Sequence, residues 1–151
     1  MEGVDAALCQ RVVEQSPDGI IVADREGLIR LWNPGAEAIF GYTAGEALGR
    51  SLDLIVPERF RAAHWAGYRR AMAEGRTKYA RQALPTRSQR KDGVAIYVEL
   101  TFAILRDASG QVLGALAHAR DITERYTQER ARRERLAELE RRVEALTGHA
   151  P

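Results

Sequence analysis

The alternation of apolar and polar residues predicts two strands near the start of the chain. Residues 20–23 are β-branched and apolar, and residues 28–32 continue that character after a polar segment at 24–27. Asp24 and Gly27 suit a tight turn between the two strands. Two strands with so short a connection must pair as an antiparallel hairpin.

A second set of apolar runs predicts three further strands, at residues 78–86, 94–105 and 111–120. The segments between the later runs contain Asp and Gly in turn positions, so the three strands form an antiparallel meander. Pro85 has no amide N–H for a strand ladder, and it places the first of these strands at an edge or a bulge.

Helical periodicity and capping residues predict helices before and between these strands. Residues 4–15 carry apolar side chains on one face and end at a Ser-Pro-Asp-Gly sequence. Asn33 caps a short helix at 35–40, and Thr43 with Glu46 forms the capping box of another. A longer helix follows from Glu58 to Glu74, between Pro57 and Gly75.

The order of these elements predicts an α+β fold, a five-stranded antiparallel sheet with short helices on one face. Alanines at 115, 117 and 119 alternate onto one face of the last strand, and Leu100 with Phe102 does so in its neighbour. If both sets face the helices, a pocket lies between the sheet and the helix 58–74. The alternative is that the helices pack directly onto the alanines and fill the space.

His64 is the candidate functional residue of the helix 58–74. Phe60, Gly67, Tyr68 and Ala71 share its face, and the two small residues among them leave room for a flat, bulky ligand. The alternative is an ordinary half-buried histidine, with small residues that let the helix approach the sheet.

Composition excludes several classes of protein. The 151 residues suit one domain, and no apolar run approaches the length of a membrane-spanning helix. The N-terminus lacks the features of a signal peptide, so we expect a soluble, cytoplasmic protein. The single cysteine, Cys9, excludes an internal disulfide and reads as structural filler. The net charge is only +2, and Arg alternates with Glu near the C-terminus, which argues against nucleic-acid binding.

A long helix from Glu124 to about Thr147 follows the last strand. Its apolar residues are spaced as a coiled-coil seam of two heptads, at Leu136, Leu139, Val143 and Leu146. An exposed helix with such a seam needs a partner, so we predict a homodimer that uses this coil and the N-terminal helix. The predicted organisation is a flanking helix at 1–15, a sensor domain at 16–123 and a coiled-coil signalling helix at 124–151.

Several motifs together resemble those of the PAS domain family, from about Val12 to Thr123. They are Ser-Pro-Asp-Gly-Ile at 16–20, Trp-Asn-Pro-Gly-Ala-Glu at 32–37, Phe-Gly-Tyr at 40–42, Gly-Arg-Ser at 49–51, Arg-Lys-Asp-Gly at 90–93 and Ala-Arg-Asp-Ile-Thr-Glu-Arg at 119–125. The resemblance implies a sensory and dimerising module of signal transduction, and the chain is then either a free-standing module or part of a larger sensor.

Within that family, residues 56–64 resemble the helix of heme-binding oxygen sensors of the FixL type and of the direct-oxygen-sensor phosphodiesterases. The resemblance implies heme b, with His64 as the proximal iron ligand and Arg70 at a heme propionate. A neutral imidazole suits heme iron, and a guanidinium suits a carboxylate.

The other side of the implied heme departs from these sensors. Leu84 falls where the FixL-type sensors have an arginine, and Gln82 falls where the phosphodiesterases have a methionine ligand. Leu84 offers no hydrogen bond to a bound gas, whereas Tyr79 or Gln82 could, so the sensed gas (O2, CO or NO) stays open. Leu100 and Phe102 match apolar positions on this side, and Ala117 and Ala119 complete the expected site.

Three functions follow from these observations: a heme gas sensor, a module for another small organic ligand, and a ligand-free dimerisation module. Catalysis is not expected, because no nucleophile and base can be placed together from the sequence.

Overall fold

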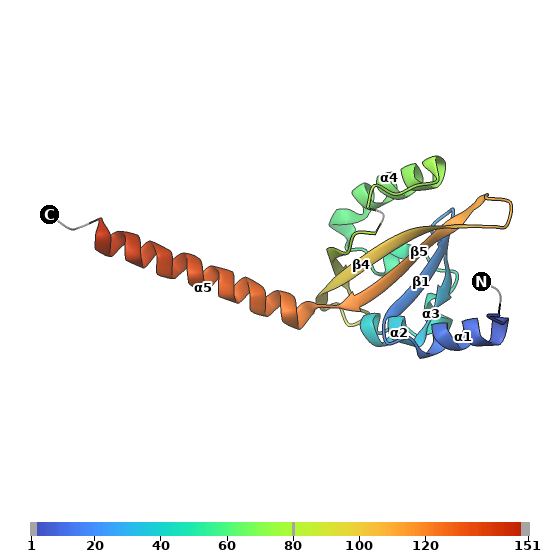
Figure 1. The fold of residues 1–151 in the computed structure, drawn as a ribbon, viewed down its shortest axis with the longest axis horizontal. Coiled ribbons are helices and arrows are strands. Elements are labelled where there is room, and N and C mark those ends of the chain that lie inside the picture. The colour runs from blue at the N-terminus through green and yellow to red at the C-terminus, as the bar shows by residue number, and fades with distance from the viewer. Residues whose placement is uncertain (1–2, 80, 149–151) are drawn as a thin grey trace. The chain divides into compact units, whose positions relative to one another are not determined.

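The computed structural model describes residues 3–79 and 81–148 (Figure 1). The residues up to Asp121 form one compact unit, and those from Ile122 onward form a second. Among the described residues, no helix is both long and apolar enough to cross a membrane.

The first half of the chain contains most of the helices. In order, its elements are α1 (Ala6–Gln15), β1 (Gly19–Asp24), β2 (Ile29–Trp32), α2 (Pro34–Phe40), α3 (Ala44–Ala47), a short 3-10 helix (Leu52–Leu54) and α4 (Glu58–Glu74). The capping predictions are confirmed, since Asn33 accepts from the N–H of Ala36 and Thr43 forms a capping box with Glu46. The predicted bounds of α4 are also confirmed.

The second half contains β3 (Leu84–Gln89), β4 (Ala95–Arg106), β5 (Val112–Asp121) and α5 (Thr123–Thr147). The prediction for the first of these strands was wrong at both ends. Residues 78, 79 and 81–83 are not strand, and Arg81 has a φ of 61°, which a strand cannot contain. Ala80, also in the predicted strand, lies outside the described residues.

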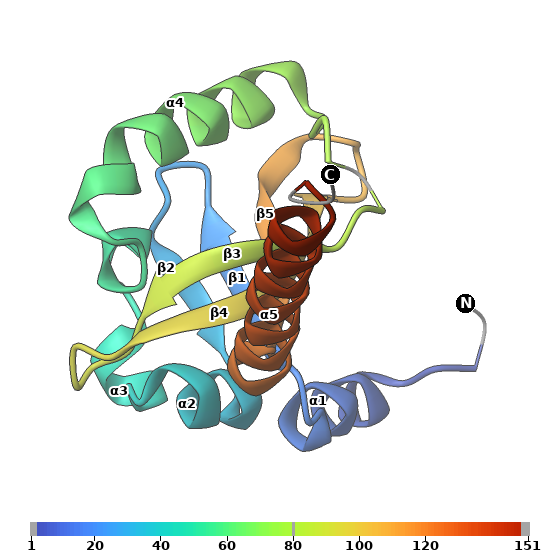
Figure 2. The same cartoon turned by 90° about the vertical axis from the view of Figure 1, so that its left-hand side faces the viewer.

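The five strands form one antiparallel sheet, as predicted, and the structure shows that their order is β2-β1-β5-β4-β3. Ala117 of β5 pairs with Ile21 of β1 and with Phe102 of β4, so these three residues share one face. β3 is an edge strand, which confirms the expectation for Pro85. In both ribbon views, α4 lies toward one end of the sheet and α2 with α3 toward the other (Figure 2).

Asn33 joins four segments near α2. Its side-chain oxygen accepts from Ile20 N–H at 2.7 Å and from Ala36 N–H at 2.9 Å. Its amide nitrogen donates to the carbonyls of Val13 at 2.9 Å and Asp18 at 3.0 Å. The side chain therefore uses its hydrogen-bonding capacity fully, although the residue is only 3% exposed.

The helix α1 packs outside the core, because none of its residues is buried. Asp5 caps it by accepting from the N–H of Leu8 at 2.6 Å. Leu8 and Val12 remain exposed, and Cys9 is an exposed free thiol. The interpretation of Cys9 as structural filler rather than a reactive thiol stays a prediction.

The helix α5 is a single helix whose described residues are all at least partly exposed. Arg130 pairs with Glu134 and Arg142 with Glu138, one helical turn apart. The seam residues Leu136, Leu139, Val143 and Leu146 are exposed. Coiled-coil pairing of this seam stays a prediction. The ends of the predicted flanking and signalling segments, residues 1–2 and 149–151, lie outside the described residues.

Candidate functional site

The helix α4 covers the sheet loosely. Gly75 ends it in the left-handed conformation, with a φ of 66°, and donates its N–H to the carbonyl of Ala71 at 2.8 Å. Met72 is the only buried residue of this helix. A helix that packed tightly on a sheet would bury a continuous apolar stripe, so α4 leaves space beneath it.

That space contains a cavity of about 470 Å³, which we call the His64 pocket. Its walls come from α4, from the sheet and from the segment before α4: Ile21, Ala23, Leu52, Ile55, Val56, Phe60, Ala63, His64, Tyr68, Pro85, Thr86, Arg87, Ser88, Leu100, Phe102, Ala115 and Ala117. The structure thus decides between the two sequence-based alternatives in favour of a pocket above the alanines of β5.

A second cavity of about 440 Å³, the Arg70 pocket, lies beside the first. The two share Ala63, His64, Tyr68, Phe102 and Ala115, so His64 borders both. The remaining lining residues of the second cavity include more polar and charged side chains: Arg70, Glu74, Arg76, Thr77, Lys78 and Tyr79. One cavity is therefore mostly apolar, and its neighbour carries cationic groups at its walls.

The imidazole of His64 is half-buried and incompletely hydrogen-bonded. Its Nδ1 atom is buried and has no hydrogen-bond partner in the described part of the chain. Burial lowers the pKa of His64, and the Asp53 carboxylate only partly opposes this effect. At neutral pH the ring is therefore uncharged, and it keeps a nitrogen lone pair, as a metal ligand requires.

Neighbouring aromatic residues hold the position of His64. The Trp65 ring lies 4.8 Å from the His64 ring, centroid to centroid, and the Tyr68 ring lies 5.9 Å away. The indole N–H of Trp65 donates to Oδ1 of Asp53 at 2.8 Å. Gly27 leaves room for Trp65, because a Cβ there would come within 2.2 Å of the indole ring.

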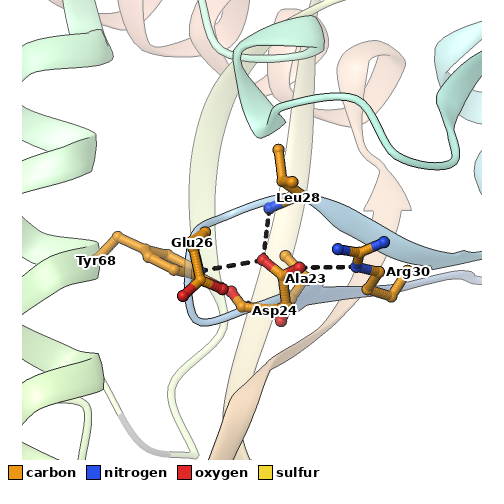
Figure 3. Close-up of polar contacts among 6 residues, drawn as sticks. All are labelled: Ala23, Asp24, Glu26, Leu28, Arg30 and Tyr68. Carbon is orange, nitrogen blue, oxygen red and sulfur yellow. Dashed lines mark hydrogen bonds and ion pairs between the residues drawn. The ribbon is translucent and has the colours of Figure 1, made fainter.

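Tyr68 attaches α4 to the turn between β1 and β2 (Figure 3). Its hydroxyl donates to the carbonyl of Asp24 at 2.5 Å and lies 3.3 Å from the carbonyl of Ala23. Burial, with smaller contributions from Asp24 and Glu26, raises the pKa of Tyr68 to about 12. The phenol is therefore a constant hydrogen-bond donor at neutral pH. At the other end of α4, Arg106 donates to the carbonyl of Gly75.

Asp24 makes this turn a firm attachment point. Its carboxylate accepts from the N–H groups of Leu28 at 2.9 Å and Glu26 at 3.0 Å, and from Nε of Arg30 at 2.7 Å (Figure 3). Burial raises the pKa of Asp24, but these hydrogen bonds outweigh that effect, and the net pKa is lowered. Asp24 therefore remains ionised and holds the turn to which α4 is bound.

The structure brings together most of the side chains that the sequence nominated. His64, Tyr68, Leu100, Phe102 and Ala117 line the His64 pocket. Gly67, Arg70 and Tyr79 line the Arg70 pocket.

Three nominated residues lie elsewhere. Gln82 is exposed and lines neither cavity. Leu84 is half-buried opposite Leu100 but is not among the lining residues. Ala119 is 1% exposed and packs in the core, because the sheet is already covered at that end. Their expected place in the site is therefore corrected.

Sequence reasoning missed Thr86 and Ser88, which line the His64 pocket from β3. The predicted strand ended at Thr86, so Ser88 was left outside any element. The alternation of the true strand, half-buried Leu84 and Thr86 followed by buried Ser88, was the signal that could have identified both.

No cluster of three or more His, Cys, Asp or Glu residues suited to a bare metal ion occurs within the described ranges. An iron atom at His64 would thus depend on a prosthetic group for its other ligands.

Comparison with known proteins places this architecture in a family. Residues 13–127 match the family described as PAS fold. An uncharacterised protein of Azorhizobium caulinodans is 35% identical over 135 residues, which cover 89% of this chain and 18% of that protein. The oxygen sensor protein DosP of Escherichia coli is 25% identical over 122 residues, 81% of this chain and 15% of DosP.

A shorter segment of 53 residues is 36% identical to the sensor protein FixL of Bradyrhizobium diazoefficiens, and covers 35% of this chain and 10% of FixL. Among solved structures, the PAS domain of a Colwellia psychrerythraea protein superimposes with a TM-score of 0.67 at 26% identity, covering 78% of this chain and 98% of that one. The chain thus spans a fifth or less of each of these curated relatives. With the predicted sheet, the matched residues and the pocket beneath α4 all in agreement, the chain belongs to the PAS fold family.

Proposed function

We propose that this PAS unit is a sensor of a diatomic gas that binds heme b, with His64 as the iron ligand. The observation that carries the proposal is the imidazole of His64. It borders two adjoining cavities, has a buried nitrogen without a partner in the described chain, and has a lowered pKa that keeps it neutral. Similarity to the oxygen sensor protein DosP over 81% of the chain supports the same function.

The residues around His64 suit a large flat group. Together the two cavities extend along α4, and a Cβ added to Gly67 would meet no atom within 4 Å, so the helix surface there is open. Heme would supply an iron that takes up a small gas molecule. Leu100, Phe102 and Ala117 would keep water from the buried part of the group.

The Arg70 pocket suits the polar edge of such a group. Arg70 is exposed at its wall, and Arg76 and Lys78 lie at the same cavity. Guanidinium and ammonium groups pair with carboxylates, but exposure to solvent limits the gain from such pairs. We therefore assign Arg70 to a propionate and expect it to contribute less than His64.

The proposal includes a signalling output through α5 in a homodimer. The apolar seam from Leu136 to Leu146 is exposed, and a second copy of the chain would cover it. Sedimentation velocity of the chain with and without residues 128–151 tests this part, because an unchanged dimer after truncation contradicts it.

A second candidate is a sensor for another small organic molecule. Each cavity alone, at about 470 and 440 Å³, is within the size range of ordinary ligand pockets and needs no metal. Failure of heme binding with an intact fold would favour this candidate.

The deciding experiment is a titration of the purified chain with hemin, followed by absorption spectroscopy. We expect saturable uptake with an intense Soret band, and we expect His64→Ala to remove or shift that band with little change in far-ultraviolet circular dichroism. His118→Ala is the matched control, because His118 is exposed and lines neither cavity. Arg70→Ala should weaken hemin retention less than His64→Ala does.

Two results would overturn the heme assignment. One is a wild-type protein that takes up no hemin. The other is a His64→Ala variant with the wild-type spectrum.

A further inference from the structure

The two cavities beneath α4 differ in the chemistry of their walls. Apolar side chains make up most of the lining of the His64 pocket, whereas three Lys or Arg side chains line the Arg70 pocket. Where the two cavities adjoin, their shared walls include the small side chains of Ala63 and Ala115. One elongated molecule can therefore place an apolar part in the first cavity and a polar part in the second.

Two of the three cations of the Arg70 pocket have no anionic partner. Arg76 pairs with Glu74, which is the one acidic residue among the described lining residues, at 3.5 Å. Arg70 makes no ion pair in the described part of the chain. Lys78 makes none there either, and its Nζ lies 4.9 Å from the centre of the Tyr79 ring. The cavity therefore has a surplus of positive charge, which favours an anionic group.

The charge of the surrounding segment has the same sign. Residues 58–91 contain ten Lys or Arg residues and two Glu, a net charge of +8, whereas the whole chain has a net charge of only +2. This segment includes α4 and β3, which both contribute walls to the cavities. A cleft with walls of one charge sign attracts ligands of the opposite sign and raises their rate of association.

The distribution of the cations indicates where the anionic group binds. Arg87 of β3 is the one Lys or Arg among the described lining residues of the His64 pocket, and it is exposed. His64 adds no positive charge, because burial lowers its pKa and keeps the imidazole neutral. The Arg70 pocket, with two unpaired cations, is therefore the better site for a negative charge.

We propose that the two cavities together bind an apolar carboxylic acid, such as a medium-chain fatty acid. Its hydrocarbon chain lies in the His64 pocket, and its carboxylate pairs with Arg70 and Lys78. This inference rests on the second candidate function, a sensor for a small organic molecule, and names the chemical class of that molecule. It needs no iron, and a fatty acid and heme would exclude each other from the same space.

The test is isothermal titration calorimetry of the hemin-free chain with decanoate, octanoate and the neutral 1-decanol. At about pH 7.5 both acids are ionised. We expect saturable binding of decanoate, and about tenfold weaker binding of octanoate, because two fewer CH₂ groups leave water. An increase in salt from about 0.05 M to about 0.5 M should weaken decanoate binding and leave 1-decanol binding unchanged.

Variants of the cations locate the carboxylate. Arg70→Ala and Lys78→Ala should each weaken decanoate binding about two- to fivefold, since exposed ion pairs are screened, and should leave 1-decanol binding unchanged. Arg69→Ala is the matched control, because Arg69 is exposed on α4 and lines neither cavity. A larger loss of decanoate binding in Arg87→Ala than in Arg70→Ala contradicts the placement of the carboxylate.

A variant of the sheet locates the hydrocarbon chain. Ala117 lines the His64 pocket but not the Arg70 pocket, so the side chain in Ala117→Leu fills part of the first cavity. We expect this variant to weaken decanoate and 1-decanol binding alike, by at least about tenfold. Far-ultraviolet circular dichroism checks its fold. If this variant does not fold, the variants of exposed Arg70 and Lys78 still decide the proposal.

Two results overturn the inference: no saturable binding of decanoate, or an equal loss of decanoate and 1-decanol binding in Arg70→Ala. A protein that binds decanoate but takes up no hemin contradicts the heme assignment and supports this inference. A protein that takes up hemin but binds no decanoate does the reverse. The two failures are therefore distinguishable.

Discussion

Two side chains at opposite ends of the PAS unit, Asn33 and His64, differ in how their hydrogen-bonding groups are satisfied. At the α2 end, Asn33 makes four hydrogen bonds that join α1, the loop before β1, β1 itself and α2. At the α4 end, Nδ1 of His64 has no hydrogen-bond partner in the described part of the chain.

Packing follows the same division. In α2, Gly35, Ala36, Ile39 and Phe40 are all buried, although the helix has only 7 residues. In α4, by contrast, only one of the 17 residues, Met72, is buried. One end therefore supplies the stability of the unit, and the other retains the unpaired nitrogen of His64 and space for a ligand.

The largest effect that would test this comparison is expected from Asn33→Ala. The substitution leaves two N–H groups, of Ile20 and Ala36, and two carbonyls without their partner, so we expect a loss of about 3 kcal/mol in the free energy of unfolding. Urea denaturation measures it, with exposed Gln82→Ala as the control. A loss below about 1 kcal/mol would show that the α2 end is not the stable part.

A matched pair of glycines should give the next largest difference. A Cβ on Gly35 would come within 2.2 Å of the carbonyl oxygen of Asp18, whereas a Cβ on Gly67 meets nothing within 4 Å. Gly35→Ala should destabilise the fold by about 2 kcal/mol. Gly67→Ala should stabilise it by about 0.5–1 kcal/mol, because alanine is the better helix former. If urea titrations show that both variants change the free energy of unfolding in the same direction, the comparison between the two ends is wrong.

The smallest expected effect is the pH dependence that His64 contributes. Its pKa is lower in the folded protein than its ordinary value of 6.5, so the unfolded chain binds the proton more readily. This contribution to stability is complete above about pH 6.5 and is lost as the pH falls toward the lowered pKa. Urea midpoints at about pH 7.5 and about pH 5.5 should therefore differ less in His64→Ala than in wild type or His118→Ala. If the difference between the two urea midpoints is the same in all three proteins, His64 does not contribute to the pH dependence of stability.

The strands and helices of the stable end could be predicted from the sequence because local signals agree there. Asn33-Pro34 and the capping box of Thr43 with Glu46 specify helix starts through their own side chains. The hairpin from Ile20 to Trp32 was equally clear, since short-range turn chemistry decides the pairing.

The site was only partly predictable because cavities depend on distances between elements. The helical spacing of His64 identified the residue, and the alternation of alanines in β5 identified the face. Neither could show whether α4 packs against that face or stands off it. Ser88 was missed because the register of β3 is set by its pairing with β4, and its own sequence of Pro, Arg and polar residues gives a weak strand signal.

The edge position of β3 has a consequence for self-association between sheets. An exposed strand edge can pair with the same edge of another molecule and begin aggregation. β3 counters this with Pro85, which has no N–H to offer a new strand, and with exposed Arg87, whose charge repels its counterpart in a second copy. The strand that bears Ser88 can therefore stay at an open edge beside the pocket without becoming a template for fibrous assembly.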